Sequence, residues 1–210
     1  MGYTLDFSAD KEQPKLVMDW YEVDRAADKI AKDILESDFL KPNMPACIVP
    51  LVRGGMPLGT ILSHKLNGLP VFPLQFQSRD YKNGHRIREV GRMRLLMNRY
   101  KNLLVVDDII DTGETMHELN IYANDLLDED QSIAIATICT RAEFDDYKWS
   151  GFSHQFTSFY LMPDVSWIVF PWEAKSLVTD VRSEKEKIKN KELRQNLNFK
   201  PKNEKRFKSK

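Results

Sequence analysis

The amino-acid sequence predicts an α/β fold, in which a parallel twisted sheet is flanked by helices and a small hood covers its carboxyl edge. Two observations predict it. Short apolar runs alternate with long connections, and several connections have the spacing of an amphipathic helix. The runs also end at glycines, acids or basic residues, as parallel strands do where they meet a ligand. The expected strands are 46–51, 71–76, 102–107 and 132–139, and the expected hood is 156–173.

Amphipathic spacing predicts a helix over 17–39, with charges opposite its apolar face. Trp20 and Tyr21, near its start, are interpreted as packing residues. Two more helices, over 56–66 and 115–127, follow the first and third strands. The apolar face of the first helix consists of Val23, Ala26, Ala27, Ile30, Ile34 and Leu35.

Length and charge predict one domain with an appendage. The chain has 210 residues, 42% of them hydrophobic, and a formal net charge of zero, so no global field attracts nucleic acid. The balance is uneven, because residues 182–210 hold 12 basic and 4 acidic residues. We interpret 182–210 as a basic, disordered tail and 1–14 as a loose segment, which leaves a domain over 15–181.

Neither cysteines nor long apolar runs indicate an exported or membrane protein. Cys47 and Cys139 lie in apolar runs and are expected to be buried hydrophobes rather than ligands or a disulfide. No apolar run approaches the length of a membrane span, and residues 1–13 lack a signal-peptide core. A cytoplasmic protein without membrane contact is the expectation.

The most informative stretch is 103–116, Leu-Leu-Val-Val-Asp-Asp-Ile-Ile-Asp-Thr-Gly-Glu-Thr-Met. A buried strand leads into Asp107 and Asp108, whose carboxylates can accept bonds from sugar hydroxyls or face a magnesium ion. After these acids, Gly113 can take a positive φ at the start of a helix, where free backbone N–H groups bind anions. Threonine hydroxyls at 112 and 115 add donors, so the stretch predicts a site for a phosphorylated ribose.

Three other interpretations of this stretch are possible in principle. A strand followed by acids is often only a solvated loop. The run Asp111-Thr112-Gly113 is also similar to an aspartic protease elbow, but the chain has no second Asp-Thr-Gly. A phosphoaspartate phosphatase would need acids two residues apart, whereas Asp107 and Asp108 are adjacent.

The run from Val105 to Thr115 resembles the phosphoribosyl-diphosphate loop of type I phosphoribosyltransferases, a family in which the chain as a whole is most similar to the bacterial xanthine–guanine and hypoxanthine enzymes. The resemblance implies that fold, with Asp107 and Asp108 on the ribose hydroxyls and beside magnesium. It also implies a ribose-phosphate loop and a catalytic set. The loop is Asp111, Thr112, Gly113, Glu114 and Thr115, and the catalytic set is Asp111, Asp107, Asp108 and Arg53.

A second turn, Val52-Arg53-Gly54-Gly55, follows the first strand and suits an anion such as pyrophosphate. It resembles the family's pyrophosphate loop, although Val52 stands where a serine is common. The resemblance implies that Val52, Arg53 and Gly54 bind pyrophosphate, with a cis peptide at Val52–Arg53. On its own, this run could equally be an ordinary turn.

The basic segment 77–99 occupies the place of the family's mobile loop, with Ser78 and Tyr81 similar to its serine–tyrosine signature. The resemblance implies that Arg86 or Arg88 reaches the pyrophosphate, and the sequence does not distinguish them. The alternative is a solvated basic loop.

The base site is indicated by two places along the chain. Arg141 ends the fourth strand, where purine-specific members have a lysine that donates to the six-position oxygen. The run from Trp167 to Glu173 resembles the hood of bacterial xanthine–guanine phosphoribosyltransferases. This implies that Trp167 stacks on the purine and that Ile168 offers backbone groups to the base edge. A buried packing role for Trp167 is the alternative, and Trp172 is expected in the core.

Together the resemblances imply transfer of a phosphoribosyl group from 5-phosphoribosyl 1-diphosphate to guanine, xanthine or hypoxanthine, with magnesium, in a homodimer or homotetramer. Asp111 is the candidate to handle the purine's proton. The alternative is a non-catalytic sensor of phosphoribosyl diphosphate that uses the basic tail, 182–210, on nucleic acid. The presence of Arg53 and a basic loop favours the enzyme, because a sensor need not expel pyrophosphate.

Overall fold

The computed structural model describes residues 4–6, 15–42, 44–75, 92–128, 130–141, 149–161 and 167–173. The chain divides into two compact units. The larger is Trp20–Pro163, and the smaller joins Met1–Asp19 to Asp164–Lys210. Among the residues within these ranges, no helix is long and apolar enough to cross a membrane.

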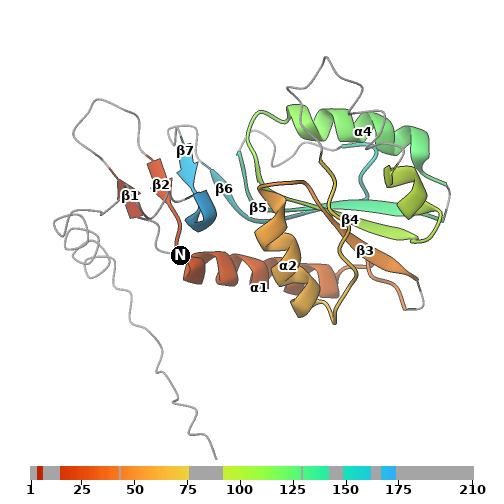
Figure 1. Ribbon diagram of the computed structural model, residues 1–210, viewed down its shortest axis with the longest axis horizontal. Helices are drawn as coiled ribbons and strands as arrows, with labels where there is room; N and C mark the ends of the chain where they lie inside the picture. Colours follow the sequence, from red (N-terminus) through yellow and green to blue (C-terminus); the bar gives the residue numbers. More distant parts are fainter. Residues whose placement is uncertain are drawn as a thin grey trace, which may run out of the picture. The chain divides into compact units, whose positions relative to one another are not determined.

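The larger unit is built on a four-stranded parallel sheet in the order β3-β4-β5-β6 (Figure 1). Its inner strands are almost wholly buried, so their long apolar runs are those of a sheet covered on both faces. This confirms the predicted parallel sheet. The strands are β3 (Ala46–Pro50), β4 (Asn102–Ile110), β5 (Ser132–Arg141) and β6 (His154–Leu161).

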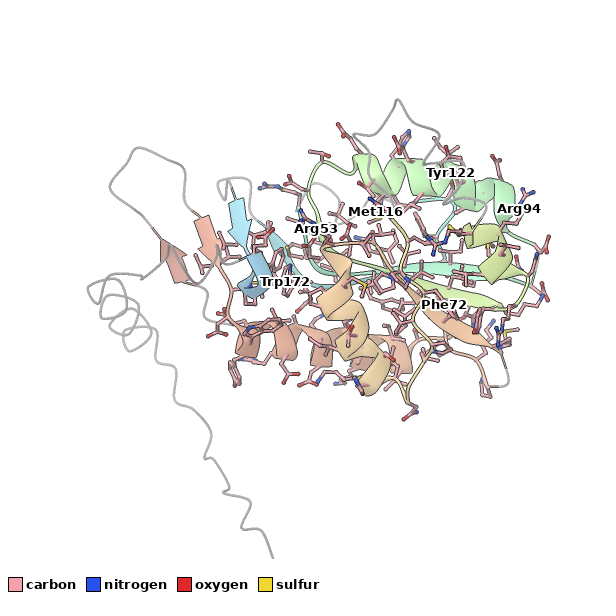
Figure 2. All side chains as sticks on the ribbon, in the orientation of Figure 1. Arg53, Phe72, Arg94, Met116, Tyr122 and Trp172 are labelled. Atoms are coloured by element: carbon pink, nitrogen blue, oxygen red, sulfur yellow. The ribbon has the colours of Figure 1, made fainter. Side chains whose placement is uncertain are left out.

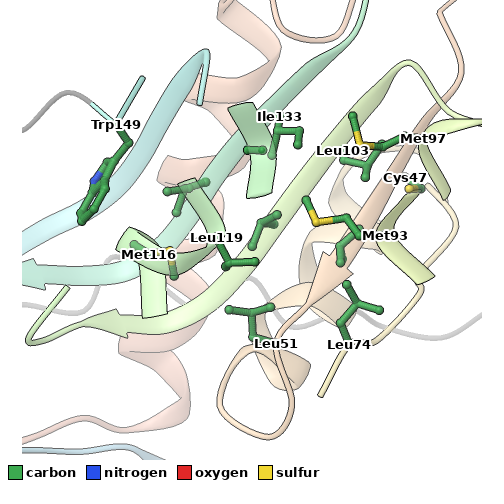
Figure 3. Close-up of a cluster of buried hydrophobic side chains, with 14 of the residues drawn as sticks. Cys47, Leu51, Leu74, Met93, Met97, Leu103, Met116, Leu119, Ile133 and Trp149 are labelled. Carbon is green, nitrogen blue, oxygen red and sulfur yellow. The ribbon is translucent and has the colours of Figure 1, made fainter. Parts of the chain in front are cut away.

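Helices cover both faces of this sheet (Figure 1). One face carries α1 (Trp20–Glu36) and α2 (Gly55–Lys65), which also contact each other. The other face carries α4 (Glu114–Leu126), and Met116 of this helix lies between it and the sheet (Figure 2). Figure 3 shows part of the resulting core, where Leu119 of α4 and the methionines of a short helix over 92–97 gather with strand residues.

Several predicted strand bounds in the sheet differ from the structure, and β5 continues beyond 139 to Arg141. The strand expected at 102–107 continues to Ile110, because Ile109 and Ile110 keep pairing with β5. The two acids therefore lie inside β4 and not in a loop after it. The run predicted as a strand at 71–76 forms no continuous strand within its described part, 71–75. It makes isolated β-bridges instead, from Val71 to Ile48 of β3 and from Leu74 to Leu51, the residue after β3.

The predicted hood, 156–173, begins too early. Residues His154–Leu161 form β6, which pairs in parallel with β5 through Phe156 and Ala136, among other pairs. Phe156 is buried and makes an edge-on ring contact with Phe39, so this segment belongs to the core sheet. Its alternation of polar and aromatic residues hides that role in the sequence.

The smaller unit contains a three-stranded sheet in the order β1-β2-β7. Here β1 (Thr4–Asp6) and β2 (Lys15–Val17) are antiparallel, whereas β2 and β7 (Trp167–Val169) are parallel. A 3-10 helix, η2 (Pro171–Glu173), follows β7. The segment expected to be loose thus contains a strand, and the helix expected from residue 17 begins only at Trp20.

Because α2 packs closely on β3, we expect a larger side chain at position 59 to destabilise the fold. A Cβ there would lie 2.5 Å from Cγ of Pro50, whose ring cannot move aside. We expect Gly59→Ala to lower the free energy of unfolding by about 1–2 kcal/mol, because overpacking exceeds the helix-propensity gain of about 1 kcal/mol. Urea unfolding measures it. Thr60→Ala, at the exposed next position, should lose no more than about 0.5 kcal/mol, and equal losses would contradict the packing argument.

Candidate active site

The turn after β3 presents a cation at the carboxyl edge of the sheet. The peptide bond between Val52 and Arg53 is cis, which confirms the prediction. Arg53 is exposed and lies at the start of α2 (Figure 2). Gly54 directly precedes this helix, so the turn joins a guanidinium to helix N–H groups. Such a set of donors suits an anion.

The same turn touches the acidic end of β4. A Cβ on Gly54 would collide with the carboxylate of Asp108, whose Cγ would be 2.6 Å away. A Cβ on Gly55 would collide with the carbonyl oxygen of Val106. Leu51 donates its N–H to that same oxygen at 2.8 Å. The predicted pyrophosphate turn and the predicted ribose acids are therefore adjacent.

The segment after β4 has the backbone expected of a phosphate loop. Gly113 has φ 73°, a left-handed conformation that favours glycine, and it immediately precedes α4. Its carbonyl accepts the N–H of His117 at 2.8 Å, so the helix begins here. The hydroxyl of Thr112 accepts a long hydrogen bond, 3.5 Å, from the N–H of Glu114. Thr115, in the first turn of α4, is partly exposed.

Asp107, the first of the two acids of β4, lies where its charge is disfavoured. Asp107 accepts the backbone N–H of Asp108 on its Oδ1 at 3.0 Å. Burial, and then the neighbouring charge of Asp108, raise the pKa of the Asp107 carboxyl well above its usual range. The ionised form of Asp107 is therefore disfavoured here, and a bound cation would stabilise it.

Magnesium fits these residues only together with a substrate. Carboxylate oxygens are its preferred protein ligands, and it is usually held by one or two of them plus substrate phosphates. Asp107 and Asp108 supply such oxygens. Within the part of the chain that the structure describes, no cluster of three or more His, Cys, Asp or Glu side chains could hold a metal ion.

Arg141 and Asp111 form an ion pair that the sequence does not reveal. Arg141, the last residue of β5, donates its Nε–H to Oδ1 of Asp111 at 2.7 Å. Arg141 is largely buried, with 18% of its side chain exposed, against 42% for Asp111. The predicted base-reading residue and the predicted proton acceptor are therefore in direct contact.

A buried hydroxyl cluster supports the end of β5 and was missed in the sequence. The hydroxyls of Thr137, Thr140 and Thr157 lie 3.0–3.2 Å apart, and all three residues are buried. Its sequence signal is weak: two threonines inside the otherwise apolar strand β5, and a third in the mixed strand β6.

The remaining predicted residues fall elsewhere. Arg86 and Arg88 lie outside the described residues, as does the side chain of Trp167. Ile168 is buried in the smaller unit, where it is the register partner of Leu16. Both cysteines are buried and free, as expected, and burial raises the pKa of Cys47 to about 12.

Comparison with known proteins decides the family. A family model described as phosphoribosyl transferase domain matches residues 17–176. The chain belongs to the phosphoribosyl transferase domain family. This membership confirms the predicted family and fold and indicates an enzyme of the glycosyltransferase type. A search of curated proteins found no match.

Solved structures of this phosphoribosyl transferase fold resemble the chain at low sequence identity. A hypothetical protein from Neisseria gonorrhoeae with bound ppGpp has a TM-score of 0.55 and 19% identity, covering 80% of this chain and 93% of its own. A purine phosphoribosyltransferase from Pyrococcus horikoshii has a TM-score of 0.49 and 22% identity, and the match covers 79% of this chain and 99% of that protein. A xanthine-guanine-hypoxanthine phosphoribosyltransferase from Helicobacter pylori has a TM-score of 0.49 and 17% identity, and the match covers 85% of this chain and 99% of that protein. The first of these similarities supports the fold alone.

The raised pKa of Asp107 predicts that its charge opposes folding. A carboxyl whose pKa is raised on folding stabilises the protein below its unfolded pKa, and that stability is lost as pH rises through the folded pKa. We therefore expect Asp107→Asn to raise the Tm at pH 7 by about 2–4 °C, the effect of about 1 kcal/mol in a chain of this size. The gain should shrink toward about pH 4, where the carboxyl of the unfolded wild type also begins to take up its proton.

Thermal melts from pH 4 to pH 8 measure this effect. Asp130→Asn is the matched control, because a hydrogen bond from Lys101 lowers the pKa of Asp130. That carboxylate favours folding when ionised, so its replacement should bring no gain at pH 7. A lower Tm for Asp107→Asn than for wild type at pH 7 would contradict the prediction.

Proposed function

We propose that the chain is a purine phosphoribosyltransferase. It transfers the phosphoribosyl group of 5-phosphoribosyl 1-diphosphate to a six-oxo purine, namely guanine, xanthine or hypoxanthine, and releases pyrophosphate. The observation that carries the proposal is the contact between Gly54 and the carboxylate of Asp108. It supports one site in which Arg53 faces a pyrophosphate while the acids of β4 face the attached ribose.

The ribose phosphate belongs on the loop from Asp111 to Thr115. Support comes from Gly113, whose left-handed backbone starts α4 and leaves helix N–H groups for an anion. Threonine hydroxyls on either side of this glycine add donors. One phosphoribosyl diphosphate molecule then spans the carboxyl ends of β3 and β4, with its anionic groups on the two helix starts and its hydroxyls on Asp107 and Asp108.

In the proposed reaction, the bond between the anomeric carbon and the pyrophosphate oxygen breaks, and its electron pair leaves with the pyrophosphate. An imidazole nitrogen of the purine forms the new bond to that carbon, and the ring proton passes to the carboxylate of Asp111. Positive charge develops on the ribose, close to Asp107 and Asp108. Arg53 stabilises the leaving anion, so most of the catalysis is positioning and electrostatics.

Asp107 and Asp108 would hold magnesium together with substrate oxygens, and the ion would supply charge neutralisation for the leaving pyrophosphate. The base is placed by Arg141, whose N–H groups suit a six-position oxygen. The family resemblance also assigns base contacts to Trp167 and Ile168 and a pyrophosphate contact to Arg86 or Arg88, and these assignments stay predictions.

Turnover tests the function directly. The protein is incubated with phosphoribosyl diphosphate, magnesium and, in turn, guanine, xanthine, hypoxanthine, adenine, uracil and orotate, while pyrophosphate and nucleotide are measured. We expect turnover with six-oxo purines. Asp111→Asn should lower kcat by about 10²–10⁴-fold, the usual worth of a proton acceptor, with little change in phosphoribosyl-diphosphate affinity.

Asp130→Asn serves as the control for this experiment, since its ion pair with Lys101 lies at the start of β5 and away from the site. Equal losses of kcat and substrate affinity in Asp111→Asn would argue against a proton role. Tight phosphoribosyl-diphosphate binding without turnover on any base would favour the sensor, and a salt-sensitive affinity for nucleic acid, lost on deleting 182–210, would support it.

A further inference from the structure

The ion pair between Arg141 and Asp111 joins two positions to which the proposed function gives separate tasks. Asp111 directly follows β4, and Arg141 ends the neighbouring strand β5. Their 2.7 Å contact is made by Nε of the guanidinium and one carboxylate oxygen. A charge-assisted hydrogen bond of this length is strong and directional. The position of one side chain therefore depends on the other.

Both the backbone and the guanidinium of Arg141 are held in place by neighbouring residues. Its backbone is the register partner of Leu161 in β6, and the preceding residue, Thr140, bonds through its hydroxyl to Thr137 and Thr157. The base of the side chain is thus fixed by a buried cluster, and its tip by Asp111. A long arginine side chain otherwise samples many rotamers, and ordering it opposes binding. A carboxylate on Nε also sets the plane in which the other N–H groups lie.

Given purine transfer as proposed above, we propose that Asp111 is also a positioning residue for base selection: it orients Arg141 toward the six-position of the purine. Recognition of an oxo group then depends on Asp111 as a hydrogen-bond acceptor, whereas catalysis depends on it as a proton acceptor. These two tasks are chemically separable. An asparagine retains the acceptor oxygen but takes up no proton, and an alanine removes both.

Nucleotide binding isolates the positioning task, because it involves no proton transfer. IMP and AMP form a matched pair, since they differ only at and next to the six-position of the purine. Their dissociation constants are measured by calorimetry for the full chain. The variants are Asp111→Asn, Asp111→Ala, Arg141→Gln, Arg141→Lys and the double variant of Asp111→Ala with Arg141→Gln.

We expect the wild type to bind IMP at least about tenfold more tightly than AMP, the effect of one hydrogen bond to a charged group. Asp111→Asn should keep most of this preference even though its kcat falls. Asp111→Ala and Arg141→Gln should each reduce the preference to within about twofold. The double variant should lose no more than Arg141→Gln, because both changes remove the same contact. Arg141→Lys, which keeps the charge, should recover part of the preference.

Asp130→Ala is the matched control. Its ion pair with Lys101, at 2.6 Å, spans the same two strands at their amino ends. This variant should keep the wild-type preference. Because 42% of the Asp111 side chain is exposed, its variants should fold, and thermal melts check this.

The inference is overturned if Asp111→Ala keeps the wild-type preference, if the wild type shows none, or if the losses in the double variant add. Failure of the proposed function looks different. If the wild type forms no pyrophosphate with any six-oxo purine, the proposed enzymatic function is wrong, whatever the nucleotide preferences are. If the wild type turns over normally and Asp111→Ala keeps its preference for IMP over AMP, only the positioning role of Asp111 is wrong.

Discussion

The site depends on the close approach of the turn after β3 to the end of β4. The parallel register pairs Pro50 with Val106, and Leu51 donates its N–H to the carbonyl of Val106 at 2.8 Å. The chain then turns into α2 within a space that admits no side chain, since a Cβ on Gly54 or Gly55 would collide with β4. The two glycines are therefore a packing requirement, and they bring the cationic turn against the acids.

Asp107 is held where its charge is disfavoured. Burial, and then the neighbouring charge of Asp108, raise the pKa of Asp107, so the ionised form of this carboxyl opposes folding. Surrounding packing compensates, because β4 is buried from Asn102 to Val106 between helices on both faces. The disfavoured charge at the end of β4 thus relies on stability supplied by the core beneath it.

Much of this architecture follows from local patterns in the sequence. The apolar run of β4, the positive φ of Gly113 and the start of α4 are dictated by short-range chemistry, and the sequence predicts them. The end of β4 is set instead by pairing with β5. Ile109 and Ile110 therefore continue the strand beyond the acids, where the sequence pattern predicts its end. The strands β1, β2 and β7, at three residues each, are too short to show a periodicity and exist through their pairing.

The contact between Asp111 and Arg141 is a consequence of sheet register. The two residues lie 30 positions apart in the chain, and no motif links them. The register pairs Ile110 with Thr140, so the next residue on each strand must be a neighbour of the other. A slip of one residue would turn every side chain of β5 to the opposite face and bury different groups. The apolar core that fixes the register of β4 and β5 therefore also places the arginine on its carboxylate.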